Sequence, residues 1–195
     1  MDSLSKKALQ PGRRLGQRRG SGRLRRALAA LLLALAISPA GAAGSWEDFF
    51  VPSMGDLRAE AADAKQAGLS GLMLMFHFEE CPYCARMKRE VLSRPEVQRH
   101  FRARFAAVAI DTRGALEVTG FDGRALPEKD FARAAGVRAT PTFQFYAPDG
   151  TLLASHRGGI FDPAEFMLLG DYVASGAYRS ESFATFKQSK QKRGS

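Results

Sequence analysis

Two cysteines separated by two residues follow a short apolar segment, and this arrangement restricts the fold more than any other feature of the chain. Residues 71–78 read Gly-Leu-Met-Leu-Met-Phe-His-Phe, and so short an apolar run predicts a central strand buried on both faces. The strand delivers the chain to Cys81-Pro82-Tyr83-Cys84, and from Pro82 onward the apolar spacing becomes helical. The sequence therefore predicts a strand, a Cys-x-x-Cys turn and a helix in direct succession.

The position of the two cysteines at a helix start is suited to thiol-disulfide exchange. Unpaired backbone N–H groups and the positive end of the helix dipole favour a thiolate at Cys81. Pro82 is tolerated at the first helical position, and we expect it to fix a turn that leaves Cys81 exposed. Cys84, one helical turn later, faces the same side. Cys81 could then attack a disulfide and Cys84 could resolve the mixed disulfide; the reverse steps would oxidise a dithiol.

A metal site is the alternative for a Cys-x-x-Cys motif. Zinc would need two further Cys or His ligands, and the chain has no other cysteine. His77, His100 and His156 are its histidines, and His77 is the one close to the motif in sequence. A copper carrier that uses Cys81, Cys84 and His77 is therefore kept as an alternative. The main expectation is a redox-active disulfide with no metal and no other cofactor.

The positive charge of the chain is concentrated at its N-terminus. The formal net charge is +9, but residues 1–42 hold nine of the 29 Lys and Arg residues and one of the 20 acidic residues. The rest of the chain therefore carries a net charge of +1, which excludes a basic surface of the size that nucleic-acid binding requires.

The same N-terminal region is predicted to be a cleavable signal peptide. A basic stretch precedes the apolar residues 27–37, and small residues follow, so cleavage is expected after Ala42. The apolar run is shorter than the roughly 20 residues of a transmembrane helix, although an uncleaved anchor helix is the alternative. We expect a periplasmic or otherwise exported protein.

The sequence after the predicted signal peptide indicates one α/β domain, residues 43–186, followed by a flexible basic tail, residues 187–195. The Asp122-Gly123 pair indicates a small hairpin. Several phenylalanines, Phe161 among them, are assigned to core or edge packing. Expected helices cover residues 57–66, 82–92, 95–101 and 127–135, and one begins after Asp162; expected strands cover 71–78, 105–110, 142–147 and 151–156.

A second motif, Ala139-Thr140-Pro141-Thr142-Phe143, enters one of these strands. With the order of elements and the Cys-Pro-Tyr-Cys motif, it resembles the thioredoxin family over about residues 53–175. The resemblance implies a thioredoxin fold, with a central mixed sheet flanked by helices and a small hairpin insertion before a cis-proline. It also implies that Pro141 is that cis-proline, beside the cysteines, and that Thr140 contacts the substrate.

Two departures from cytosolic thioredoxins are visible. Met75 stands where that family has a buried aspartate, and Glu80 replaces a tryptophan. The overall pattern is most similar to periplasmic thioredoxin-like proteins of bacterial sulfur-oxidation systems. This similarity implies an exported thiol-disulfide oxidoreductase that reduces disulfide-bearing periplasmic proteins and receives electrons from a membrane donor. A dithiol oxidase of the same fold is the alternative.

Overall fold

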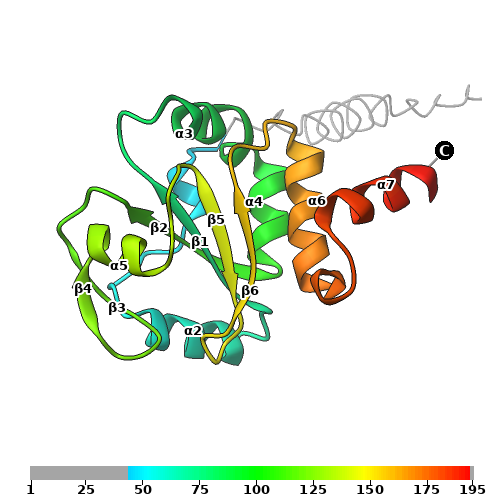
Figure 1. The fold of residues 1–195 in the computed structure, drawn as a ribbon. Helices are drawn as coiled ribbons and strands as arrows, with labels where there is room; N and C mark the ends of the chain where they lie inside the picture. The colour runs from blue at the N-terminus through cyan, green and yellow to red at the C-terminus, as the bar shows by residue number, and fades with distance from the viewer. Residues whose placement is uncertain (1–43, 194–195) are drawn as a thin grey trace, which may run out of the picture. The chain divides into compact units, whose positions relative to one another are not determined.

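The structure, a computed structural model, describes residues 44–193 (Figure 1). The predicted signal peptide, residues 1–42, lies outside the described residues. No helix within residues 44–193 combines the length and the hydrophobicity needed to cross a bilayer.

A mixed sheet forms the centre of the fold and confirms the expected architecture. Its strand order is β2-β1-β5-β6, with β1 parallel to β2 and antiparallel to β5. A separate two-stranded hairpin, β3-β4, precedes β5 in the chain, as the Asp122-Gly123 pair predicts. The strands are β1 (Gly71–His77), β2 (Phe105–Asp111), β3 (Glu117–Thr119), β4 (Ala125–Pro127), β5 (Thr142–Tyr146) and β6 (Leu152–Arg157).

Helices cover both faces of the sheet (Figure 1). One hydrophobic cluster lies between the sheet and η1, α3, η2, α4, α6 and α7, and the other lies between the sheet and α2, α5 and the hairpin. The bounds are η1 (Glu47–Phe49), α2 (Leu57–Gln66), α3 (Pro82–Met87), η2 (Lys88–Leu92), α4 (Pro95–Arg102), α5 (Glu128–Ala134), α6 (Pro163–Ala174), η3 (Ala177–Arg179) and α7 (Phe183–Arg193).

Strand β1 is buried on both faces, as its composition predicts. Met73 and Met75 belong to the first cluster, whereas Leu72, Leu74 and Phe76 belong to the second. The alternation follows from the two-residue period of a strand. The cysteine motif therefore begins at the end of a strand that both cores hold in place.

Aspartate side chains start two of the helices at the predicted positions. Asp56 Oδ1 accepts hydrogen bonds from the backbone N–H groups of Arg58 and Ala59, at 3.0 and 3.1 Å, and so caps α2. Asp162 caps α6 in the same way. Capping satisfies N–H groups that a helix leaves unpaired at its first turn.

Two local features differ from the expectations. Residues 88–92 of the predicted helix form a π-helical segment, η2. Residues 187–193, expected to belong to a flexible tail, continue α7. Phe186 anchors this helix because its ring is buried against Tyr172, and Lys187 pairs with Glu165 at 2.8 Å.

Candidate functional site

Cys81 and Cys84 form a disulfide at the N-terminus of α3. Cys81 is the N-cap residue, and its Sγ accepts a hydrogen bond of 3.1 Å from the backbone N–H of Cys84. Pro82 is in the first turn of the helix, where a missing N–H costs no helical hydrogen bond. The predicted strand, turn and helix are thus present, and one N–H group of the first helical turn, that of Cys84, is directed at the Cys81 sulfur.

The exposure expected for Cys81 is wrong. In the disulfide state its exposed fraction is 2%, close to the 1% of Cys84. Both sulfurs belong to the cluster that includes Met75 and Met87, and the Thr140 side chain covers Sγ of Cys81. The sequence places Cys81 in a turn, but it does not show which distant segment packs over that turn.

The segment that covers Cys81 contains the second motif. The Thr140-Pro141 peptide bond is cis, which confirms what the family resemblance implies. Strand β5 begins at the next residue, Thr142, which pairs with Phe76 near the end of β1. Antiparallel pairing therefore brings Thr140 to the cysteines, and its Oγ1 donates to Cys81 Sγ at 3.3 Å.

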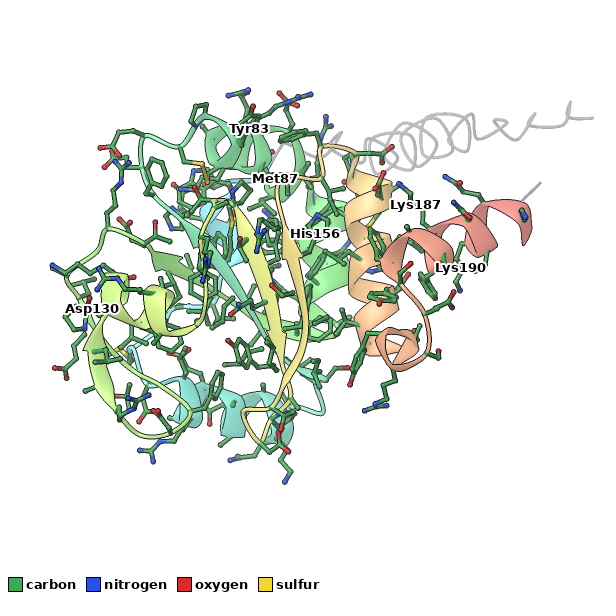
Figure 2. All side chains as sticks on the ribbon, viewed as in Figure 1. Tyr83, Met87, Asp130, His156, Lys187 and Lys190 are labelled. Atoms are coloured by element: carbon green, nitrogen blue, oxygen red, sulfur yellow. A yellow bond between two sulfur atoms is a disulfide. The ribbon has the colours of Figure 1, made fainter. Side chains whose placement is uncertain are left out.

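Tyr83 forms the outer side of the motif. Its exposed fraction is 62%, and Figure 2 shows it at the surface of α3, whereas Met87 lies toward the sheet. Its ring stacks on Phe161, with the centroids 6.3 Å apart, and the Arg86 guanidinium lies 4.0 Å from the centre of the same Phe161 ring. Phe161, predicted to serve in packing alone, thus takes part in the surface beside the disulfide.

Met75 is fully buried in the cluster that contains Cys84, so this apolar residue occupies the region where a carboxylate is expected in the family. The same face of β1 carries His77 two residues later. His77 Nδ1 lies 3.4 Å from Nζ of Lys88, which stands one turn after Cys84 on the helix. Lys88 also lies over the Trp46 ring, at 3.9 Å.

Burial lowers the pKa values of this basic pair. Loss of hydration is the main cause that lowers the pKa of His77, and the charge of Lys88 lowers it further. Loss of hydration likewise lowers the pKa of Lys88. The carboxylates of Glu47, Asp111 and Glu79 act in the opposite direction, because their negative charge favours the protonated amine. His77 is therefore favoured as a neutral imidazole at neutral pH.

This environment gives no support to the copper-carrier alternative. Across residues 44–193, no three His, Cys, Asp or Glu side chains are grouped so that they could hold a metal ion. His77 contacts Lys88, and Cys81 and Cys84 are joined to each other.

A cationic group on the other side of the motif was missed by the sequence reasoning. The Arg113 guanidinium lies 3.8 Å from the centre of the Phe78 ring, and its Nη1 donates to Glu80 Oε2 at 3.0 Å. Arg113 follows β2, whose last residue, Asp111, pairs with His77 at the end of β1. Because parallel strands end at the same sheet edge, the predicted succession of strand 71–78, helices and strand 105–110 was the available signal.

Residues 57–174 match the family described as thioredoxin-like domain. No curated protein matches the sequence. A thioredoxin-fold protein from Helicobacter pylori is 16% identical over 77% of this chain and 96% of that chain, with a TM-score of 0.59, and this likeness confirms the predicted thioredoxin fold. A thioredoxin from Thermus thermophilus is 30% identical over 63% of this chain and 88% of that chain, with a TM-score of 0.49. The C-terminal domain of Neisseria meningitidis DsbD, in the reduced form, is 18% identical over 60% of this chain and 93% of that chain, with a TM-score of 0.45.

Proposed function

Because the chain belongs to the thioredoxin-like family, whose members are generally thiol-disulfide oxidoreductases, we propose that it exchanges electrons with the disulfides of partner proteins. The observation that supports this most directly is the Cys81–Cys84 disulfide at a helix N-terminus, with the Thr140 hydroxyl on the Cys81 sulfur. In this proposal Cys81 is the nucleophile, Cys84 is the resolving thiol, and Thr140 and Pro141 contact the substrate. The disulfide is the redox centre, and no other cofactor is needed.

The reaction begins with the reduced protein. The Cys81 thiolate attacks one sulfur of the partner disulfide, a Cys81–partner disulfide forms, and the second partner sulfur leaves as a thiolate. Cys84, having lost its proton to the surroundings, attacks Cys81 Sγ, so that the mixed disulfide breaks and the first partner sulfur leaves. Two electrons pass to the partner, whose thiolates take up two protons, and the Cys81–Cys84 disulfide remains.

Two hydrogen bonds support Cys81 as the attacking residue. The backbone N–H of Cys84 and the hydroxyl of Thr140 both donate to its Sγ, at 3.1 and 3.3 Å. Hydrogen bonds to an ionised group are stronger than those between neutral groups, so these donors favour the thiolate over the thiol. Both sulfurs are buried in the same apolar cluster, so these two donors, rather than a difference in exposure, support the assignment of Cys81 to the first step and Cys84 to the second.

We propose reduction as the direction in the cell. The similarity in sequence to periplasmic thioredoxin-like proteins of bacterial sulfur-oxidation systems favours this direction, with an exported location, disulfide-bearing periplasmic partners and a membrane electron donor. The connection between β2 and β5 consists of the β3–β4 hairpin and α5, without the bulky helical insertion expected for oxidases that resemble the periplasmic disulfide-forming family.

Reduction of insulin disulfides, with dithiothreitol as the electron source, tests the activity. The wild type should accelerate insulin precipitation and Cys81→Ser should not; wild-type-like activity of that variant would contradict the assignment of the nucleophile. Equilibration with thiol-disulfide buffers then tests the direction. A reduction potential near about −270 mV supports a reductase, whereas one near about −120 mV would make the protein an oxidase.

A further inference from the structure

A hollow of about 270 Å³ adjoins the redox site and shares Thr140 with it. Thr140, whose hydroxyl contacts Cys81 Sγ, forms one part of its wall, and Phe78, the residue directly after β1, forms another. The hollow is therefore within reach of a side chain that stands close to a partner's reactive cysteine. Its remaining lining comes from the two residues after β2 and from the loop that precedes β5.

Two residues that line the hollow are charged, and both are arginines, Arg113 and Arg138. Arg113 is held in place because its guanidinium lies over Phe78 and donates to Glu80. Arg138 is exposed, in the loop between α5 and β5, and forms no ion pair within the part of the chain that the structure describes. The hollow thus offers one guanidinium already held by a carboxylate and one that is available.

The neighbouring acids do not cancel this charge. The carboxylate of Asp111 accepts from the backbone N–H of Arg113, at 2.8 Å, and does not line the hollow. Glu79 does not line the hollow either. Glu80 is the acid paired with Arg113, and both side chains are well exposed, at 72% and 63%. An exposed pair of this kind is weak, so an incoming carboxylate can compete with Glu80 for Arg113.

We propose that this hollow selects partner proteins that carry Asp or Glu next to the reactive cysteine. The inference rests on the proposed function and assigns to it a class of partner. A guanidinium binds a carboxylate through two parallel hydrogen bonds, which fixes geometry as well as charge. The stacked rings of Tyr83 and Phe161 do not line the hollow, so the charged hollow and this aromatic pair are separate features of the surface around the motif.

The experiment compares three peptides, each with one internal disulfide, that differ in a single residue beside the first cysteine: Glu, Gln or Lys. The rate constant for their reduction by the reduced protein is measured by quenched flow and mass spectrometry. We expect the Glu peptide to react about fivefold faster than the Lys peptide at low salt, with Gln between them. The ratio should fall toward one at 0.5 M NaCl, because salt screens exposed charges.

Arg138→Glu is the test variant, since this exposed side chain forms no ion pair within residues 44–193 and the change places a carboxylate in the hollow. It should reverse the preference between the Glu and Lys peptides. Arg99→Glu is the matched control, because it makes the same change in net charge at an exposed position of α4 that does not line the hollow. It should leave the ratio at the wild-type value.

Bis(2-hydroxyethyl) disulfide, a neutral substrate, distinguishes a failure of the partner selection from a failure of the proposed function. If the wild type reduces it but treats all three peptides alike, the selection of acidic partners is wrong and the proposed function stands. An equal shift of the ratio in Arg138→Glu and Arg99→Glu would also overturn the hollow as the selective element. If the wild type reduces neither the neutral disulfide nor the Gln peptide, the proposed function fails, and the inference fails with it.

Discussion

The hydroxyl of Thr140 lies 3.3 Å from Sγ of Cys81, although 59 positions separate the two residues. The contact exists because β5 runs antiparallel to β1 and starts where β1 ends. A hydroxyl in this position can donate to the sulfur both in the disulfide and in the thiolate. It therefore connects the second sequence motif to the reactivity of the first.

Replacement of Thr140 by Val removes this donor while it keeps the shape of the side chain. A hydrogen bond to a charged group contributes about 1.5–3 kcal/mol, so the thiolate of Cys81 should become about tenfold less populated at neutral pH. The measurement is the rate of alkylation of reduced protein by iodoacetamide between pH 5 and 9. Thr140→Ser, which keeps a hydroxyl, should react like the wild type. Equal pH profiles for the Val variant and the wild type would show that the hydroxyl does not act on the thiolate.

Cys84→Ser should trap the partner. Without the resolving thiol, the Cys81–partner disulfide cannot be broken from within, so a mixed disulfide accumulates. After reaction with a disulfide-bearing peptide, intact-mass spectrometry should show protein plus one peptide in this variant and no adduct in Cys81→Ser. An adduct on Cys81→Ser instead would exchange the roles of the two cysteines.

Phe166→Ala should lower the free energy of unfolding by about 3–5 kcal/mol, the usual cost of removing a fully buried aromatic side chain. Phe166 is completely buried and contacts the rings of Phe101 and Phe143, with centroids 4.6 and 5.0 Å away. Urea unfolding followed by circular dichroism measures the change. Tyr83→Ala, at an exposed position, should stay within about 0.5 kcal/mol of the wild type. A similar loss in both variants would contradict the central role of the aromatic cluster.

His77→Gln should reduce the loss of stability on acidification. Burial and the charge of Lys88 lower the pKa of His77 below its ordinary value of 6.5 in the folded state. Below pH 6.5 the unfolded chain therefore binds a proton that the folded chain resists, so stability falls as the pH falls. This one group can contribute at most about 1.4 kcal/mol by pH 5.5.

The measurement is urea unfolding of the wild type and His77→Gln at pH 7.5 and 5.5. The difference between the two proteins matters, because other groups titrate as well: burial also lowers the pKa of His156, whereas it raises the pKa values of Glu60 and Glu128. His156→Gln serves as a parallel case with the same expected sign. A wild type and a His77→Gln variant with identical pH dependence would show that His77 does not resist protonation.

The elements around the motif could be predicted because their signals are local. The apolar run of β1, Pro82 at the helix start and the capping residues Asp56 and Asp162 each act within a few residues. The family resemblance added the cis bond before Pro141, which no local pattern of charge or hydrophobicity requires.

The surroundings of the cysteines could not be predicted in the same way, because they depend on contacts between distant segments. Tyr83 stacks on Phe161, and Arg113 lies over Phe78. Each pair joins segments that are distant in the sequence, and the contact depends on strand register and helix packing. The burial of Cys81 has the same origin, since it follows from the position of the segment before β5.

Strand β1 sends alternate side chains into the two hydrophobic clusters, and this has a consequence for the motions of the protein. Separation of β1 from the sheet would remove buried side chains from both hydrophobic clusters. We therefore expect the amide hydrogens of β1 to exchange with solvent only when the whole domain unfolds. The β3–β4 hairpin forms a sheet of its own and can open at a smaller cost in free energy. The disulfide thus follows closely on the strand that we expect to open last.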